Sequence, residues 1–171
     1  MSKAKLINRL RWYYPLEKFH AFVTFPLLTA YFLMHNPIAK SIMFVYGMIV
    51  CIAILYQGQR YWQLKLWHLQ NKPFSQVKNL KFFRGAKRLN ILLIIAMPVV
   101  FIIQVLVAKW SLNDTNIIFW TLLANLFAVL EYINYYHKQL MVDNFADVNY
   151  IVRNKKLKTA SLAKNLNENS F

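Results

Sequence analysis

Four apolar stretches of about twenty residues constrain this 171-residue chain more than any other feature. A bilayer core is about 30 Å thick and a helix rises about 1.5 Å per residue, so a crossing helix needs about 20 apolar residues. Windows of this length occur at 16–35, 41–60, 89–108 and 116–136. Their apolar residues are continuous rather than alternating, which favours helices over barrel strands. The sequence therefore predicts an all-α, polytopic membrane protein with a four-transmembrane-helix bundle spanning 15–137.

The composition excludes several other classes of protein. Hydrophobic residues make up 58% of the chain, against about 45–50% in soluble domains. There is one cysteine, Cys51, and it lies inside an apolar run, which excludes a disulfide-stapled fold. With three glycines the chain has no glycine-rich phosphate loop, and we identify no catalytic residues.

Short connections predict how the four helices pair. Asn36 and Pro37 form a tight turn between the first two windows, and residues 111–114 offer a capping box before the last one. Each pair of helices is therefore expected to form an antiparallel hairpin. The second helix should continue beyond the bilayer to about Gln70, because no helix breaker precedes Pro73.

The positive charges predict the orientation. The chain holds 21 lysines and arginines. All but Lys40 and Lys109, which lie in the two short turns, fall before the first window, at its start, between 60 and 88, or after 137. By the positive-inside rule both termini and the long connection are cytoplasmic, and we expect a bacterial cytoplasmic membrane, although an endoplasmic reticulum location obeys the same rule. A signal peptide at 1–39 is disfavoured, since Pro26 interrupts its apolar run.

Two segments outside the bundle carry much of this charge. Residues 1–14 are expected to lie as a basic interfacial segment, and residues 138–171 to form a basic tail with short helices from about Asn144 and Thr159. Basic and aromatic residues near membrane ends are expected to bind anionic headgroups or a partner, and nucleic acid is the less favoured reading. These residues are Arg9, Arg11, Trp12, Trp62, Trp67, Lys78, Lys81, Arg84, Lys87 and Arg88.

Polar residues within the windows form a layer near the cytoplasmic side. All four predicted helices contribute, because counting 1.5 Å per residue places His20, Gln57, Arg60, Asn90 and Glu131 at similar depth. One interpretation is a proton or ion relay, or the mouth of a cavity. The preferred one is a structural network in which Glu131 pairs with Arg60 or His20.

The last window has a polar face that continues this layer. At 100° per residue, Asn125, Glu131 and Tyr135 lie on one side, which should face the bundle, and Asn134 belongs to the same polar string. Asn125 lies deepest and needs acceptors for its amide group. We predict that these are the carbonyls freed by prolines, those of Phe22 or Ile94, or the Thr24 hydroxyl.

Metal and haem sites are disfavoured by residue spacing. Glu17 and His20 have the carboxylate–histidine spacing of di-iron bundles, but such a site needs a second pair and two more carboxylates. The other acid within the windows is Glu131. We predict no metal and no cofactor, with haem or metal binding through Glu17, His20 and His137 as the alternative.

Two classes of function remain. We prefer a non-enzymatic, membrane-anchored interaction or scaffold subunit, with a basic surface facing anionic lipid and a second copy or a cytoplasmic protein as partner. The alternative is an oligomeric channel or transporter, or a small membrane enzyme, using the polar layer around Glu131. Four helices enclose little beyond their own packed core, so transport would need several copies.

Overall fold

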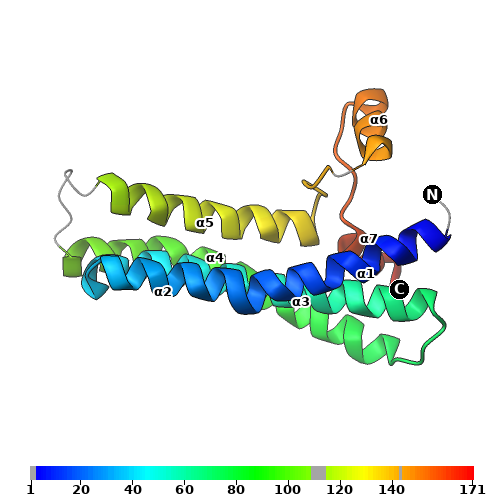
Figure 1. Ribbon diagram of the computed structural model, residues 1–171, viewed down its shortest axis with the longest axis horizontal. Coiled ribbons are helices and arrows are strands. Elements are labelled where there is room, and N and C mark those ends of the chain that lie inside the picture. Colours follow the sequence, from blue (N-terminus) through cyan, green and yellow to red (C-terminus); the bar gives the residue numbers. More distant parts are fainter. Residues whose placement is uncertain (1–2, 109–114, 143) are drawn as a thin grey trace.

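The computed structural model describes residues 3–108, 115–142 and 144–171, and these form an elongated helical bundle (Figure 1). A π-helical turn, His20–Thr24, joins the first two helices, and an isolated β-bridge links Lys138 to Thr159. The α-helices are α1 (Lys3–Phe19), α2 (Phe25–His35), α3 (Ile38–Leu69), α4 (Gln76–Ala108), α5 (Thr115–Tyr136), α6 (Phe145–Asn154) and α7 (Ser161–Glu168). The capping box expected at 111–114 lies outside the described residues.

Three helices, α3, α4 and α5, are long and apolar enough to cross a membrane. The first apolar window falls instead on α1, the π-helical turn and α2, with right-handed helical backbone at both joints. Pro26 lies in the first turn of α2 and has no backbone N–H to offer the preceding turn. The extra residue of a π-helical turn accommodates such a break without ending the helical path.

Two helix boundaries differ from or refine the sequence prediction. Helix α3 ends at Leu69, close to the expected end at Gln70. Helix α4 begins at Gln76 rather than at Leu89, so residues 76–88, which precede the third apolar window, are the first part of a 33-residue helix. The reason is packing: Leu80 and Phe83 are buried and give this segment an apolar side against the rest of the bundle.

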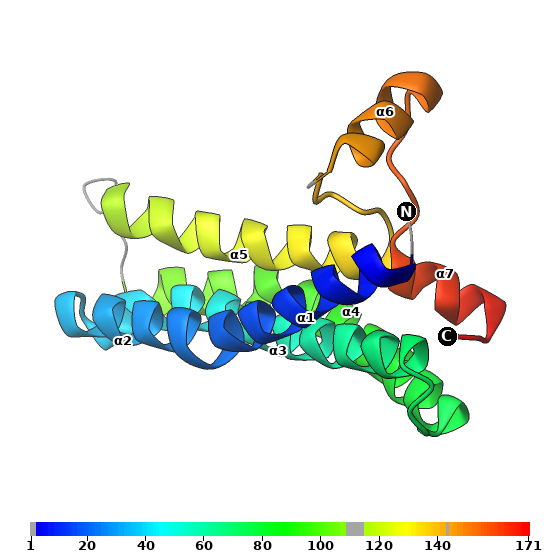
Figure 2. The same ribbon diagram turned by 45° about the vertical axis from the view of Figure 1, so that its right-hand side comes forward.

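Two positively charged parts of the chain, the start of α1 and the end of α3 with the start of α4, gather at one end of the bundle, where α7 also lies. The start of α1, the connection between α3 and α4, and helix α7 lie at that end in both views, while the α2–α3 turn lies at the other (Figure 1 and Figure 2). Helices α3 and α4 have 32 and 33 residues. They are thus about 50 Å long and extend well beyond a 30 Å core.

Helix α3 is the centre of the bundle, and α1, α4 and α5 pack on it. Half of its apolar window is buried, compared with 11% of the window in α4. The fully buried Val50, Ile54 and Tyr61 on α3 form the middle of the core. The outward sides of α4 and α5 expose large apolar residues, as helices that face lipid do. On α4 these include Leu89, Leu92, Ile95, Val99, Ile102 and Leu106, and on α5 Phe119, Leu122 and Leu126.

Candidate functional site

A fully buried amide pair connects the three long helices. Gln57 on α3 donates to Asn90 on α4 at 3.0 Å, and the Asn90 amide donates back to Gln57 at 2.7 Å. The Tyr136 hydroxyl at the end of α5 donates to the same Gln57 oxygen at 2.7 Å. Each of these polar groups has a partner, so this part of the polar layer is a structural connection between helices.

The carboxylates of the layer are arranged differently from the expected ion pair. Glu17 accepts a 2.5 Å hydrogen bond from the Tyr135 hydroxyl, which joins α1 to α5. Glu131 accepts from the Asn134 amide at 3.5 Å and lies one helical turn before Tyr135, the partner of Glu17. The predicted pairing of Glu131 with a basic residue is therefore wrong.

The two basic candidates of the layer have other partners. Arg60 donates to Asn79 at 3.2 Å and lies over the ring of Phe82, 4.8 Å from its centroid. Both partners belong to the first turns of α4, which sequence analysis did not place in a helix. His20 bonds Thr24 at 3.1 Å on its own segment.

Asn125 is buried and bonded, as expected, but not to the expected acceptors. Its amide donates to the carbonyls of Met43 at 3.0 Å and Thr121 at 2.8 Å. A Cβ at Gly47 would lie 2.8 Å from the Asn125 amide group, so glycine at this position allows α3 and α5 to approach. The nearest α3 carbonyl, rather than one freed by a proline, therefore accepts the bond.

Gln104 is a buried link that the site prediction did not include. Its side chain accepts from the Met43 N–H at 2.9 Å and donates to the Ala39 carbonyl at 2.6 Å. In a regular helix the Met43 N–H and the Ala39 carbonyl would bond to each other across one turn. Gln104 thus ties α4 to the first turns of α3. Its isolation in an apolar window is the sequence signal that could have identified it.

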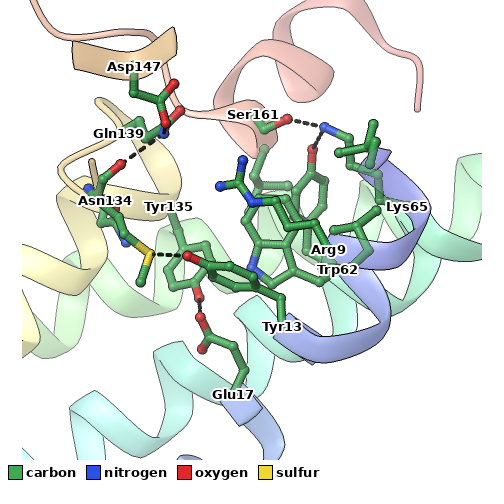
Figure 3. Close-up of a pocket in the computed structure, with 15 residues that line it drawn as sticks. Arg9, Tyr13, Glu17, Trp62, Lys65, Asn134, Tyr135, Gln139, Asp147 and Ser161 are labelled. Carbon is green, nitrogen blue, oxygen red and sulfur yellow. Dashed lines mark hydrogen bonds between the residues drawn. The ribbon is translucent and has the colours of Figure 1, made fainter. Parts of the chain in front are cut away.

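A cavity of about 170 Å³ lies at the basic end of the bundle (Figure 3). Helices α1, α3 and α5 and the tail contribute its walls. Glu17 and Tyr135 are at its inner side, and Arg9 and Lys65 line it from α1 and α3. The lining consists of Leu6, Arg9, Leu10, Tyr13, Glu17, Tyr61, Trp62, Lys65, Asn134, Tyr135, Gln139, Met141, Asp147, Ser161 and Leu162.

Cations and aromatic rings are paired within this cavity. The Arg9 guanidinium lies 5.2 Å from the centre of the Tyr13 ring, and the Lys65 ammonium lies 5.6 Å and 5.8 Å from those of Tyr61 and Trp62. Lys65 also donates to Ser161 of the tail. Such cation–aromatic contacts hold the two charged groups in place. Arg9 and Lys65 thus bring positive charge to a lining that also contains the carboxyl groups of Glu17 and Asp147.

The C-terminal tail folds back over the cavity. Tyr61 donates to Asn165 of α7 at 2.7 Å, and α7 buries Leu162 and Leu166 against the bundle. Asn134 accepts from the backbone N–H groups of Leu140 and Met141 and so fixes the chain where it leaves α5. Lys65 and Ser161 were not predicted from the sequence, because their contact joins distant parts of the chain.

The predicted lipid- or partner-binding residues fall into two groups. Trp62, Trp67, Lys87 and Arg9 are partly buried, with both tryptophans packed on the core. The exposed group is Arg11, Trp12, Lys78, Lys81, Arg84 and Arg88. Arg84 of this group donates to Asn169 beyond α7. These residues therefore surround the same end of the bundle that contains the cavity.

The histidines have local partners. His137 bonds the Tyr132 hydroxyl at 3.1 Å, and burial together with the nearby charge of Lys87 lowers its pKa. The lowered pKa favours the uncharged form of the ring at pH 7. Within the described residues, no group of three or more histidine, cysteine or acidic side chains is placed to hold a metal ion.

A larger apolar groove of about 740 Å³ lies between α2, α3 and α5, toward the other end of the bundle. Phe25, Phe32, Phe44 and Phe127 are among its walls.

Comparisons of this chain with protein-family models, with curated proteins and with solved structures found no match.

Proposed function

We propose that this protein is a non-enzymatic, membrane-anchored interaction subunit that binds anionic lipid headgroups at its basic end. The observation that carries the proposal is the cavity there, into which Arg9 and Lys65 bring positive charge between Tyr13, Tyr61 and Trp62. Anionic lipid attracts each lysine or arginine near its surface by about 1 kcal/mol. A cavity of 170 Å³ is smaller than a drug-sized pocket and suits a headgroup rather than a whole lipid.

We further propose that four segments cross the membrane, with both termini cytoplasmic and in two antiparallel hairpins. The gathering of the chain start, the α3–α4 connection and α7 at one end supports this topology. The positive-inside rule then places that end in the cytoplasm, in a bacterial inner membrane on our reading. A second copy or a cytoplasmic protein is the proposed partner for the exposed basic surface.

Replacing Lys65 with glutamine tests the proposed headgroup site. Removing one charge should weaken binding of labelled phosphatidylglycerol to the protein in phosphatidylcholine nanodiscs about five-fold, which corresponds to about 1 kcal/mol. Fluorescence energy transfer from the protein to the labelled lipid measures the affinity. Lys65→Arg should restore it, since arginine keeps the charge.

Lys40→Gln is the matched control, because Lys40 lies in the first turn of α3, at the opposite end of the bundle. It should leave the affinity for phosphatidylglycerol unchanged. If both variants lost affinity for phosphatidylglycerol equally, or if Lys65→Gln lost none, the result would contradict a headgroup site in the cavity.

A second candidate function rests on the two carboxylates. Glu17 on α1 bonds Tyr135, which lies one turn after Glu131 on α5, and one Glu17 oxygen is buried with no hydrogen-bond partner. Such acids within membrane helices are typical of proton or ion pathways. An oligomeric channel, transporter or small membrane enzyme would use them.

Glu131→Gln separates the two functions. If the protein is a lipid-binding subunit, this variant should keep its oligomeric state and its affinity for phosphatidylglycerol. A relay requires loss of proton flux in protein-containing liposomes, followed by a pH-sensitive dye, with the oligomeric mass unchanged. Wild-type liposomes without flux would exclude the relay.

A further inference from the structure

Helix α6 carries an apolar face that nothing in the described chain covers. Phe145, Val148 and Val152 are 77%, 42% and 69% exposed. Their spacing of three and four residues places them along one side of the helix. A surface helix of a water-soluble protein turns such a face inward. This helix turns it outward and therefore requires a partner of its own.

The opposite side of α6 is what fixes its position. Asp147 lies 200° around the helix from Phe145 at 100° per residue, and it is buried. It accepts hydrogen bonds from Lys158 at 2.5 Å and Gln139 at 3.1 Å, and the Asn144 side chain caps the helix at the Asp147 N–H. The helix is thus held by its polar side, with the apolar face directed away from the protein.

The position of α6 relative to the bundle suits a membrane surface. It begins nine residues after α5 ends at Tyr136, and the Lys138–Thr159 bridge holds the connecting chain near that end. Both views show α6 extending to the side of the bundle, across its long axis (Figure 1 and Figure 2). If the long axis crosses the bilayer, this direction lies along the membrane plane.

Charge identifies the partner surface. Arg153, Lys155 and Lys156 follow the apolar face and are exposed, while the Asp147 carboxylate is paired with Lys158 and turned inward. An apolar stripe flanked by cations is the pattern of helices that lie in an anionic headgroup layer. We propose that α6 inserts Phe145, Val148 and Val152 into the anionic surface of the bilayer that the bundle crosses. This inference deepens the proposed function and rests on its membrane topology.

Spin labels on α6 test this arrangement in the full-length protein. Cys51 is the one cysteine of the chain, so a Cys51→Ala background accepts single labels at Val148→Cys, Val152→Cys or Asn154→Cys. Asn154 is the matched control, because it is exposed on the side opposite Phe145. In nanodiscs containing phosphatidylglycerol, we expect several-fold higher oxygen-to-nickel-chelate accessibility at 148 and 152 than at 154.

Other outcomes would overturn the inference. Equal, water-like accessibility at all three positions would mean that α6 does not enter the membrane. Low access of both reagents at 148 and 152 with dipolar broadening would mean that a second copy covers this face. Low access without broadening would mean that another part of the protein does.

The spin-label accessibility of α6 can be judged independently of the Lys65→Gln test of the headgroup site. A lipid-inserted label at Val148 with no effect of Lys65→Gln on lipid affinity would reject the cavity and keep the α6 inference. A water-exposed label with a normal Lys65 effect would reject the α6 inference and keep the cavity. As a further check, Phe145→Ser with Val152→Ser should reduce lipid accessibility of a label at Val148.

Discussion

Replacing Gly58 with alanine is expected to destabilise the protein strongly. A Cβ at this position would lie 2.3 Å from Cζ and 2.4 Å from the hydroxyl oxygen of Tyr135, whose ring is buried and bonded to Glu17. Overpacking costs about 1–3 kcal/mol, and better helix propensity returns up to about 1 kcal/mol. We expect a net loss of about 1–2 kcal/mol, measured by reversible unfolding in mixed micelles.

Gly85→Ala is the matched control on α4. An added Cβ at Gly85 would meet no neighbouring atom within 4 Å. The substitution should therefore act only through helix propensity, and the free energy of unfolding should stay the same or rise slightly. In a Tyr135→Leu background the cost of Gly58→Ala should shrink, because the clashing atoms are gone. Equal effects of the two glycine substitutions would contradict the close α3–α5 approach.

Replacing Gln57 with leucine is expected to have a comparably large effect. It leaves Asn90 without its amide partner and removes the acceptor of the Tyr136 hydroxyl. A buried polar group left unsatisfied costs about 1–3 kcal/mol, and interhelical bonds in membranes average about 0.6 kcal/mol. We expect a loss of about 2 kcal/mol in the same unfolding assay.

The double variant Gln57→Leu with Asn90→Leu distinguishes this network from simple packing. Removing both amides leaves fewer unsatisfied groups, so the double variant should be more stable than the sum of the single losses implies. Tyr136→Phe, which removes one hydroxyl, should cost less than Gln57→Leu. Strictly additive single losses would contradict coupling between the two amides.

The positions of three long helices could be predicted from apolar length alone. The windows at 41–60, 89–108 and 116–136 fall on α3, α4 and α5, which are long enough to cross a membrane. The start of α4 could not be predicted, because Leu80 and Phe83 face the core beside charged residues that suggest an interface. The π-helical turn at His20–Thr24 also has no counterpart in a hydropathy profile.

The depth of a polar residue along its helix could be predicted better than the direction in which its side chain faces. Gln57 and Asn90 were placed in one layer and do meet. Glu131 was placed there as well but bonds Asn134 rather than a cation, because its neighbours depend on how the helices rotate against one another. The cavity could not be predicted, since Ser161 and Leu162 reach it through the folded-back tail.

Helix α3 runs unbroken from Ile38 to Leu69, from the turn after α2 to the residues beside the cavity. A straight rod of about 48 Å acts as a lever. Bundles lean when a bilayer becomes thinner than their apolar length, and a lean of about 5° moves the far end of such a lever by about 4 Å. If the bundle crosses the bilayer as proposed, a change in bilayer thickness therefore shifts Lys65 sideways along the membrane plane while leaving its height nearly unchanged.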